Sequence, residues 1–158
     1  MRDLTAIMAP TINSYRRFSA CSWAGATATW GVDNRSSGLR AISEGEEGTR
    51  LRHRQPGEDL GPYLGVAAAL AGGLGGVERG LQAPPRTDAD VYARDAAAAR
   101  PLPRSLAEAT ESLHASVVAR DWLGEDFIGH HVTMKRAEVD AAALAVTDWE
   151  VARYLEAL

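Results

Sequence analysis

The sequence has little of several features that mark particular classes of protein. Its single cysteine, Cys21, excludes a disulfide within the chain and indicates a reducing, cytoplasmic setting. No apolar run approaches the length of a membrane span, and an N-terminal stretch broken by Pro10 is a poor signal peptide. The net charge of -4 lacks the basic excess of a general nucleic-acid binder. We therefore expect no membrane and no nucleic acid as partners.

The positive charge that is present is concentrated in one region. The 158 residues suffice for one ordinary domain, and a hydrophobic content of 46% suits a soluble globular protein. Residues 16–54 hold seven arginines, at positions 16, 17, 35, 40, 50, 52 and 54, against four acidic residues. The rest of the chain is acidic and compensates for them. No internal repeat is visible.

Alternating arginines dominate residues 49–64. If Arg50, Arg52 and Arg54 lie on a β-strand, all three guanidiniums project from one face. Cations side by side on one face repel each other unless an anion lies opposite. Arginine offers a fork of donors and keeps its charge, so such a face suits phosphates or carboxylates. The pattern indicates an anion-binding strand, followed by a turn and a helix that begins near Pro62.

The region from about residue 26 to residue 54 predicts a few antiparallel strands. Residues 26–32 alternate small and β-favouring residues, and residues 39–42 form a second strand. Residues 44–48 are a polar hairpin loop that leads back into the arginine strand. The connections are too short for parallel crossovers, so we expect antiparallel pairing throughout.

Helices follow the strands, which makes the expected fold class α+β. A helix is predicted over 60–77, with one apolar stripe toward the core that consists of Leu60, Leu64, Ala67, Ala71 and Leu74. The glycines of this helix indicate either close packing against a neighbour or fraying at its end. The segment 81–103 predicts a mostly exposed excursion. Further helices are expected over 105–116 and 127–144 and after a cap at Thr147, with a turn at 121–124.

The first residues already follow an apolar pattern. Leu4, Ile7 and Met8 are spaced like the end of an amphipathic helix that Pro10 stops. One interpretation is a truncated domain, which would expose this surface and tend to aggregate or oligomerise. The other is a short helix that starts at the terminus.

Four motifs in this order and spacing resemble the glutamine synthetase family: APTINSYRR (9–17), WGVDNRSSGLR (30–40), the arginine strand with GPYL (50–64), and TDWEVARYLEAL (147–158). The resemblance covers essentially all 158 residues and is nearest the γ-glutamyl-polyamine synthetase-like branch. It implies the C-terminal part of that family's catalytic domain, without the N-terminal small β domain and the first part of the catalytic domain. The family joins ammonia or an amine to the γ-carboxyl of glutamate through γ-glutamyl phosphate, using ATP and Mg²⁺ or Mn²⁺.

The resemblance implies roles for five arginines. Arg35 would be catalytic, beside the transferring phosphoryl group. Arg17 and Arg54 would bind the glutamate substrate, and Arg40 and Arg50 would bind the nucleotide. Phosphoryl transfer depends on positioning and charge neutralisation, and arginines supply both. The alternative is that the arginines form surface ion pairs with the acidic residues Glu44, Glu46, Glu47 and Asp59.

One departure from the family concerns the metal. In the family the strand reads Arg-x-Glu-x-Arg, and its central Glu is a metal ligand. Arg52 occupies that position here, and a guanidinium cannot ligate a divalent cation. His130 and His131 are adjacent on a predicted helix, so they cannot face one ion together, and we expect them at the surface. The sequence therefore predicts no metal ligand in this chain.

These features lead to a hypothesis with two levels. By ancestry the chain is an ATP-dependent carbon–nitrogen ligase or the C-terminal piece of one, with ATP and glutamate as its ligands. By chemistry we expect the chain alone to be inactive. The alternatives are one half of a split enzyme completed by a separate N-terminal half, a non-catalytic anion-binding or assembly module, and a gene fragment without a selected function. A homo-oligomer also remains open.

Overall fold

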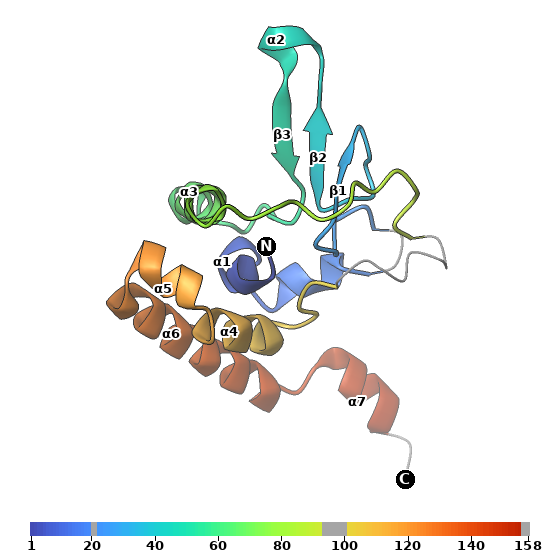
Figure 1. Cartoon of the computed structure of the whole chain (residues 1–158). Helices are drawn as coiled ribbons and strands as arrows, with labels where there is room; N and C mark the ends of the chain where they lie inside the picture. The colour runs from blue at the N-terminus through green and yellow to red at the C-terminus, as the bar shows by residue number, and fades with distance from the viewer. Residues whose placement is uncertain (20–21, 93–100, 156–158) are drawn as a thin grey trace.

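The computed structural model describes residues 1–19, 22–92 and 101–155, so Cys21 lies outside the described residues. It confirms the α+β class, with a small sheet on one side and a group of helices on the other (Figure 1). The elements are η1 (Arg2–Leu4), α1 (Thr5–Met8), η2 (Asn13–Arg17), β1 (Trp30–Val32), β2 (Leu39–Ile42), α2 (Gly45–Gly48), β3 (Arg50–His53), α3 (Pro62–Glu78), α4 (Leu106–His114), α5 (Val117–Leu123), α6 (Glu125–Leu144) and α7 (Asp148–Tyr154).

The sheet has the strand order β1-β2-β3, and the prediction for its pairing was half right. β2 and β3 form the expected antiparallel hairpin, with the short α2 at its tip. β1 pairs with β2 in parallel, with Trp30 against Leu39 and Val32 against Ala41, so antiparallel pairing was wrong for these two strands. A three-residue strand rises only about 10 Å. The connection over 33–38 is long enough to return along so short a strand.

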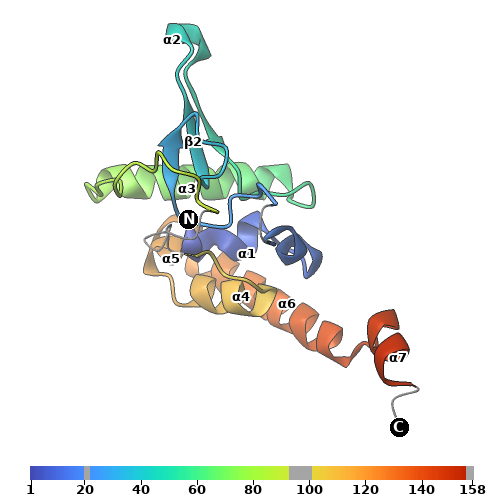
Figure 2. The same cartoon turned by 90° about the vertical axis from the view of Figure 1, so that its right-hand side faces the viewer.

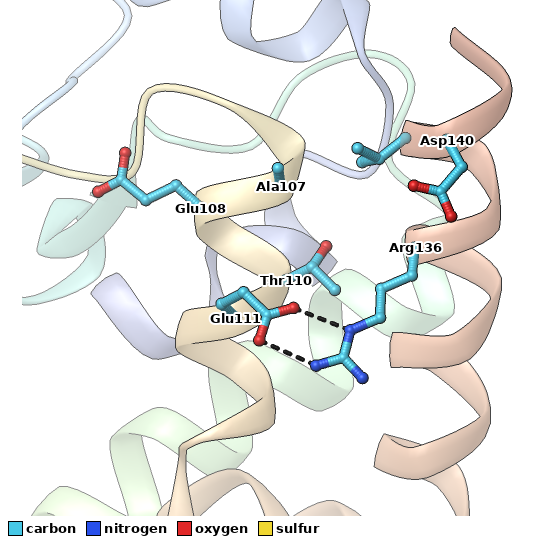
Figure 3. A pocket seen from close by; sticks show the side chains of 7 residues that line it. Ala107, Glu108, Thr110, Glu111, Arg136 and Asp140 are labelled. Atoms are coloured by element: carbon cyan, nitrogen blue, oxygen red, sulfur yellow. Dashed lines mark hydrogen bonds and ion pairs between the residues drawn. The ribbon is translucent and has the colours of Figure 1, made fainter. Parts of the chain in front are cut away.

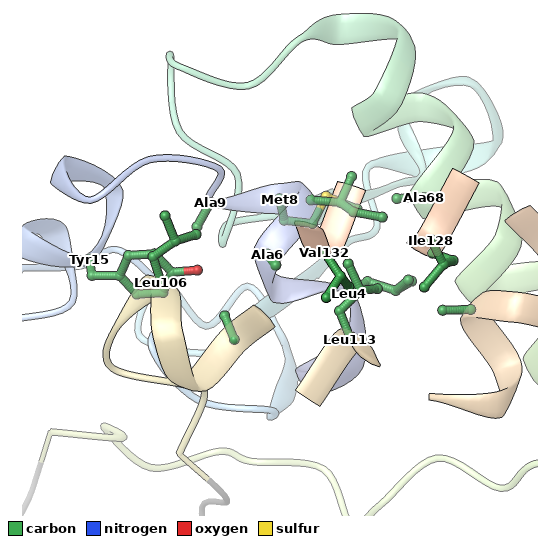
Figure 4. Close-up of a cluster of buried hydrophobic side chains, with 13 residues drawn as sticks. Leu4, Ala6, Met8, Ala9, Tyr15, Ala68, Leu106, Leu113, Ile128 and Val132 are labelled. Atoms are coloured by element: carbon green, nitrogen blue, oxygen red, sulfur yellow. The ribbon is translucent and has the colours of Figure 1, made fainter. Parts of the chain in front are cut away.

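The N-terminal apolar residues lie in short helices, η1 and α1, and belong to the hydrophobic core. Leu4, Ile7 and Met8 are at most 7% exposed, which contradicts the expectation that this segment presents an apolar surface. The reason is that α1 packs against α3 on one side and α4 on the other (Figures 1 and 4). Their partners in the buried cluster include Ala68, Leu106, Leu113, Ile128 and Val132.

Helix α3 packs through small residues, and the expected apolar stripe was only partly right: Ala71 is buried and Leu60 packs against the core. Its buried positions include Ala68 and Gly75, whereas Leu64 and Leu74 are 39% and 50% exposed. A Cβ added at Gly75 would lie 2.8 Å from the indole Nε1 of Trp122 on α5. This contact confirms the interpretation of the glycines as close packing, and it turns the larger side chains outward. The helix begins at Pro62 as predicted.

Three of the remaining described helices, α4, α5 and α7, begin at side-chain caps, whereas α6 begins after Gly124 without one. Ser105 accepts a hydrogen bond from the Glu108 amide, and Thr147 forms a full capping box at the start of α7, as expected. The predicted turn at 121–124 was wrong for its first three residues, because Ser116 caps α5 and only Gly124, with φ 88°, breaks the helix. Helix α7 projects away from the helical layer (Figure 2). Among the described helices, none combines the length and apolarity needed to cross a membrane.

The segment 81–103 is only partly the exposed excursion that the sequence indicates. Its described beginning is mostly exposed, but the Thr87 amide donates to the Trp30 carbonyl at 2.9 Å and ties the segment to β1. Leu102, near its end, is buried. Residues 93–100 of this prediction lie outside the described residues.

Candidate anion-binding site

Four arginines converge on one cavity, which we call the arginine pocket. Its volume is about 440 Å³, and its lining consists of Trp23, Arg35, Arg40, Arg52 and Arg54. This volume lies within the range of about 300–1,000 Å³ typical of small-molecule sites. The pocket brings together three of the five arginines that the sequence singled out for function, together with Arg52.

The hairpin register explains why these side chains meet. Arg40 on β2 pairs directly with Arg52 on β3, and residues directly opposite in an antiparallel pair share one face. Arg54 follows Arg52 by two residues and therefore projects to the same side. The Arg54 amide still donates to the Gly38 carbonyl at 2.9 Å, which extends the hairpin pairing to this residue. The predicted alternation thus holds in the pocket for Arg52 and Arg54.

Two of these guanidiniums are held by residues with unusual backbone conformations. Arg40 forms an ion pair of 2.9 Å with Asp33, and Arg54 donates to the Trp23 carbonyl at 2.5 Å. Trp23 (φ 58°) and Asp33 (φ 50°) are the only non-glycine residues of the described part with positive φ. Such conformations cost energy, most of all for a bulky residue, and they concentrate at functional sites.

Gly25 allows Arg54 to lie where it does. Its φ is +67°, and an added Cβ would lie 2.9 Å from the Cβ of Arg54 and 3.1 Å from the Cα of Gly38. Both neighbours are backbone or near-backbone atoms, so neither can move aside easily. The loop therefore requires glycine on two grounds, its φ and the space available.

The charge of the pocket is largely uncompensated by the described part of the chain. There, the ion pair between Arg40 and Asp33 is the only one made by the four arginines. Burial lowers the pKa of Arg54, and the positive charge of Arg52 lowers it further, followed by smaller effects of other arginines. The Nε atoms of Arg40 and Arg54 are buried and have no hydrogen-bond partner among the described residues. The exposed guanidiniums of Arg35 and Arg52 can donate to an anion, and the pocket has an excess of positive charge to attract one.

The other two arginines with predicted roles lie elsewhere. Arg17 donates to the carbonyls of Gln55 and Pro56 at 3.5 and 3.4 Å, and it lines a separate cavity of about 630 Å³ that Asp59 also lines. Arg50 forms an ion pair of 3.0 Å with Glu44 near the hairpin tip. For Arg50 the structure thus matches the alternative of an exposed surface pair.

Sequence reasoning missed the contribution of Trp23. Its carbonyl holds Arg54, and its ring packs edge-on against Tyr92 with 5.7 Å between ring centroids. No motif marks Trp23, because it acts through its main chain and through a positive φ that a tryptophan seldom adopts. Asp33 is one of the four acidic residues among the arginines of 16–54, and the sequence did not predict its ion pair with Arg40.

The residues present do not fit a divalent cation. Such an ion needs several oxygen donors, and the lining of the arginine pocket offers four guanidiniums and an indole ring. Within the described ranges, no group of three or more His, Cys, Asp or Glu side chains could hold a metal ion. His130 is exposed as expected, but the surface prediction was wrong for His131, which is 9% exposed and packs against Phe127.

A second cavity, of about 390 Å³, lies between α4 and α6 (Figure 3). Glu111 and Arg136 face each other across it and form a bidentate ion pair with distances of 2.8 and 2.9 Å. Its one cation is therefore already paired, and Asp140 adds negative charge, whereas Glu108 is paired with Arg2. This cavity is less suited to an anion than the arginine pocket.

Comparisons with known proteins relate the whole chain to one family. The family model described as "Glutamine synthetase, catalytic domain" matches residues 1–154. The chain is 39% identical over 155 residues to a glutamate–isopropylamine ligase of a Pseudomonas species, covering 98% of this chain and 34% of that protein. It is also 39% identical over 156 residues to the gamma-glutamylethanolamide synthetase GlnA4 of Streptomyces coelicolor, covering 99% of this chain and 33% of that protein.

A solved structure supports the same relationship at the level of the fold. The chain superimposes on the structure titled "GmaS/ADP complex-Conformation 1" with a TM-score of 0.85 and 34% identity, covering 98% of this chain and 36% of the other. The chain thus spans about a third of the length of the relatives it matches.

Proposed function

The chain belongs to the glutamine synthetase family, and its relatives include γ-glutamyl-amine synthetases. We propose that it supplies the phosphate-binding part of an ATP-dependent γ-glutamyl ligase. The reaction would join an amine to the γ-carboxyl of glutamate. The convergence of Arg35, Arg40 and Arg54 on one pocket is the observation that carries this proposal. The two ligases that the chain resembles take isopropylamine and ethanolamine by name, which supports a small amine as acceptor.

Within this proposal each arginine has one task. Arg35 is exposed and free to approach the transferring phosphoryl group, whose developing charge it would neutralise. Arg40 is oriented by Asp33 and would hold a nucleotide phosphate. Arg54 is oriented by the Trp23 carbonyl and would hold the reacting end of glutamate. Bidentate contacts of this kind orient carboxylates and phosphates as well as attract them.

Arg17 and Arg50 have weaker support. Arg17 retains a role toward glutamate only if the substrate reaches from the arginine pocket to the cavity beside Asp59. Arg50 would have to leave Glu44 to contact a nucleotide. Exposed ion pairs are weak, so this exchange costs little, and we retain both residues as secondary contacts.

We further propose that residues 1–158 form the C-terminal part of a catalytic domain whose other parts lie outside these residues. The relatives are about three times as long, and the described part of this chain offers no metal-binding group. Ligase activity would then require both the remaining segments, on the same polypeptide or on a separate one, and a carboxylate in place of Arg52. On its own, this chain would bind anions without forming product.

A chimera tests the proposed function. The segment of the Pseudomonas glutamate–isopropylamine ligase that matches this chain is replaced by this chain carrying Arg52→Glu. ATP-dependent γ-glutamyl hydroxamate formation should appear in the chimera and be absent from the free chain. Adding Arg35→Gln should lower the rate about 10²–10³-fold. Adding Arg136→Gln, which removes an exposed arginine outside the pocket, should not.

Two results would count against the ligase. One is a folded Arg52→Glu chimera that forms no hydroxamate. The other is an Arg35→Gln chimera that is as active as its parent, which would remove Arg35 from phosphoryl transfer.

A further inference from the structure

We propose that the arginine pocket binds a condensed phosphate, such as pyrophosphate or tripolyphosphate, without any divalent cation. The inference deepens the proposed function and rests on it for the idea that phosphate groups occupy this pocket. What it adds is the role of Arg52, which lines the pocket together with Arg35, Arg40 and Arg54. In this arrangement the fourth guanidinium supplies the positive charge that a metal ion otherwise brings to a polyphosphate.

The geometry of the hairpin makes Arg52 part of the site. Its cross-strand partner is Arg40, so the two side chains leave the sheet next to each other on one face. Arg40 is held in place by Asp33, with its side chain only 16% exposed. Arg52 is exposed and has no ion pair within the described residues, so it is available to a ligand that already contacts Arg40.

The charge balance favours a multiply charged ligand. Four cations face one bound carboxylate, that of Asp33, which leaves a formal excess of three positive charges among the described groups. The pKa of Arg54 is lowered first by burial and then by the positive charge of Arg52, so its neighbour disfavours the charged form of Arg54. A chain of linked phosphates relieves this repulsion over its whole length, whereas a single carboxylate relieves it at one point.

The donor chemistry disfavours a cation in the same place. A hard divalent ion seeks oxygen ligands, and the pocket lining presents donors of hydrogen bonds only, apart from main-chain groups. An ion placed beside Arg52 would also be repelled by the guanidinium. A magnesium-bound phosphate therefore brings a positive charge into a pocket that already has an excess of it, and free phosphate should bind better.

The pocket is also built to hold its arginines in position. Trp23 and Asp33 adopt positive φ values and fix two guanidiniums, and Gly25 leaves room for Arg54. A surface cluster of arginines without a ligand would not require strained residues on two separate loops. The strain is thus best explained by a ligand that needs these guanidiniums in place.

Calorimetric titration of the full chain tests the inference. The ligands are sodium pyrophosphate, tripolyphosphate, ATP and adenosine, each with EDTA and again with excess Mg²⁺. We expect the phosphates to bind in EDTA, to bind less tightly in Mg²⁺, and to weaken as salt is added. Tripolyphosphate binding as tightly as ATP would identify the phosphate chain as the ligand, whereas tighter ATP binding would add a nucleoside contact. Adenosine should not bind.

Variants connect the binding to the pocket. Arg52→Gln should weaken tripolyphosphate binding about tenfold, the usual effect of losing one charge-assisted contact. Arg35→Gln should do the same, and it serves as a second exposed position if the first variant folds poorly. Arg136→Gln, the matched control outside the pocket, should bind within about twofold of the wild type.

Three results would overturn the inference: no binding in EDTA, binding that requires Mg²⁺, or an Arg52→Gln variant that binds as tightly as the wild type. These failures differ from a failure of the ligase. If the Arg52→Glu chimera is active but the free chain does not bind phosphates without metal, only the present inference is refuted. Metal-free binding by the free chain together with an inactive Arg52→Glu chimera would refute only the ligase.

Discussion

Arg40 and Arg52 lie directly opposite each other across the antiparallel pair β2 and β3. Opposite residues in such a pair have Cβ atoms only about 4.5–5.5 Å apart, so two guanidiniums at these positions repel each other. One carboxylate, that of Asp33, offsets this within the described residues. A sheet selected for stability alone would place a neutral or acidic residue at one of the two positions. We infer that the repulsion between Arg40 and Arg52 lowers the stability of the free protein and that the two residues are there to bind an anion.

Arg52→Gln should therefore stabilise the free protein while weakening anion binding. A cross-strand side-chain pair changes the free energy of unfolding by about 0.2–1 kcal/mol. For a chain of this size, removing the repulsion corresponds to a rise in Tm of up to about 4 °C. The measurement is thermal unfolding with and without tripolyphosphate. A fall in Tm of the ligand-free variant would show that Arg52 has a stabilising partner, and the idea of a destabilising pair would be wrong.

Gly25→Ala should disturb both the fold and the pocket. A positive φ costs an alanine about 1–2 kcal/mol, and at Gly25 the new Cβ also crowds Arg54. Gly80→Ala is the matched control, because Gly80 has φ +59° and open space around its Cβ position. Chemical denaturation should show the larger loss for Gly25→Ala, and only this variant should lose tripolyphosphate affinity. Equal losses in the two variants would contradict a contact between Gly25 and Arg54.

Stability should fall as the pH is lowered below about 6.5. Burial lowers the pKa of His131 and of His53 below the ordinary value for histidine. The unfolded chain therefore binds more protons than the folded chain below about pH 6.5, and the stability that is fully present above this pH is lost as the pH falls. Urea unfolding at pH 7.5, 6.5 and 5.5 measures the effect.

His131→Gln should reduce this loss, because it removes one buried group that titrates. His130→Gln is the control on the neighbouring, exposed position of α6 and should leave the pH dependence unchanged. The assignment to His131 is wrong if the two variants respond to pH in the same way.

The outer face of α3 should promote self-association of the chain. A stripe of large apolar side chains on this helix is at least 50% exposed and consists of Tyr63, Val66, Leu70, Leu74 and Val77. Contiguous apolar surface of this kind favours contact with another protein surface. The double variant Leu70→Lys and Leu74→Lys should shift the chain toward the monomer in sedimentation equilibrium. Val117→Lys, at an exposed apolar position on α5, should not. A wild type that stays monomeric at high concentration contradicts the prediction.

The sequence predicted most of the helices and the hairpin because their signals are local. Pro62 at a helix start, the Ser105 and Thr147 caps, and the alternation of Arg52 with Arg54 each depend on a few neighbouring residues. The errors came from packing between distant segments. The inward face of α3 depends on its packing against α1 and α5, including the contact of Gly75 with Trp122, and no periodicity within α3 reveals these distant partners.

The same distinction applies to the site. The hairpin register brings Arg40 to Arg52, and a register can be inferred from alternation and loop length. The sequence could not decide whether Arg50 lines the pocket or pairs with Glu44. The alternation of arginines on the strand is compatible with both arrangements. The contribution of Trp23 depends on its main-chain conformation, which its residue type does not encode.

The most direct test of the proposed role of residue 52 compares two chimeras of the Pseudomonas ligase, one with Arg52 and one with Arg52→Glu. The readouts are ATP-dependent hydroxamate formation and the Mg²⁺ dependence of ADP binding. Two unit charges about 4 Å apart interact by about 4 kcal/mol at an effective dielectric of about 20, so Arg52 strongly disfavours a nearby cation. We expect the Arg52 chimera to be inactive and to bind ADP without Mg²⁺, Arg52→Glu to be active with Mg²⁺-dependent binding, and Arg52→Ala to lie between them. An Arg52 chimera that is as active as the Arg52→Glu chimera would contradict the central claim.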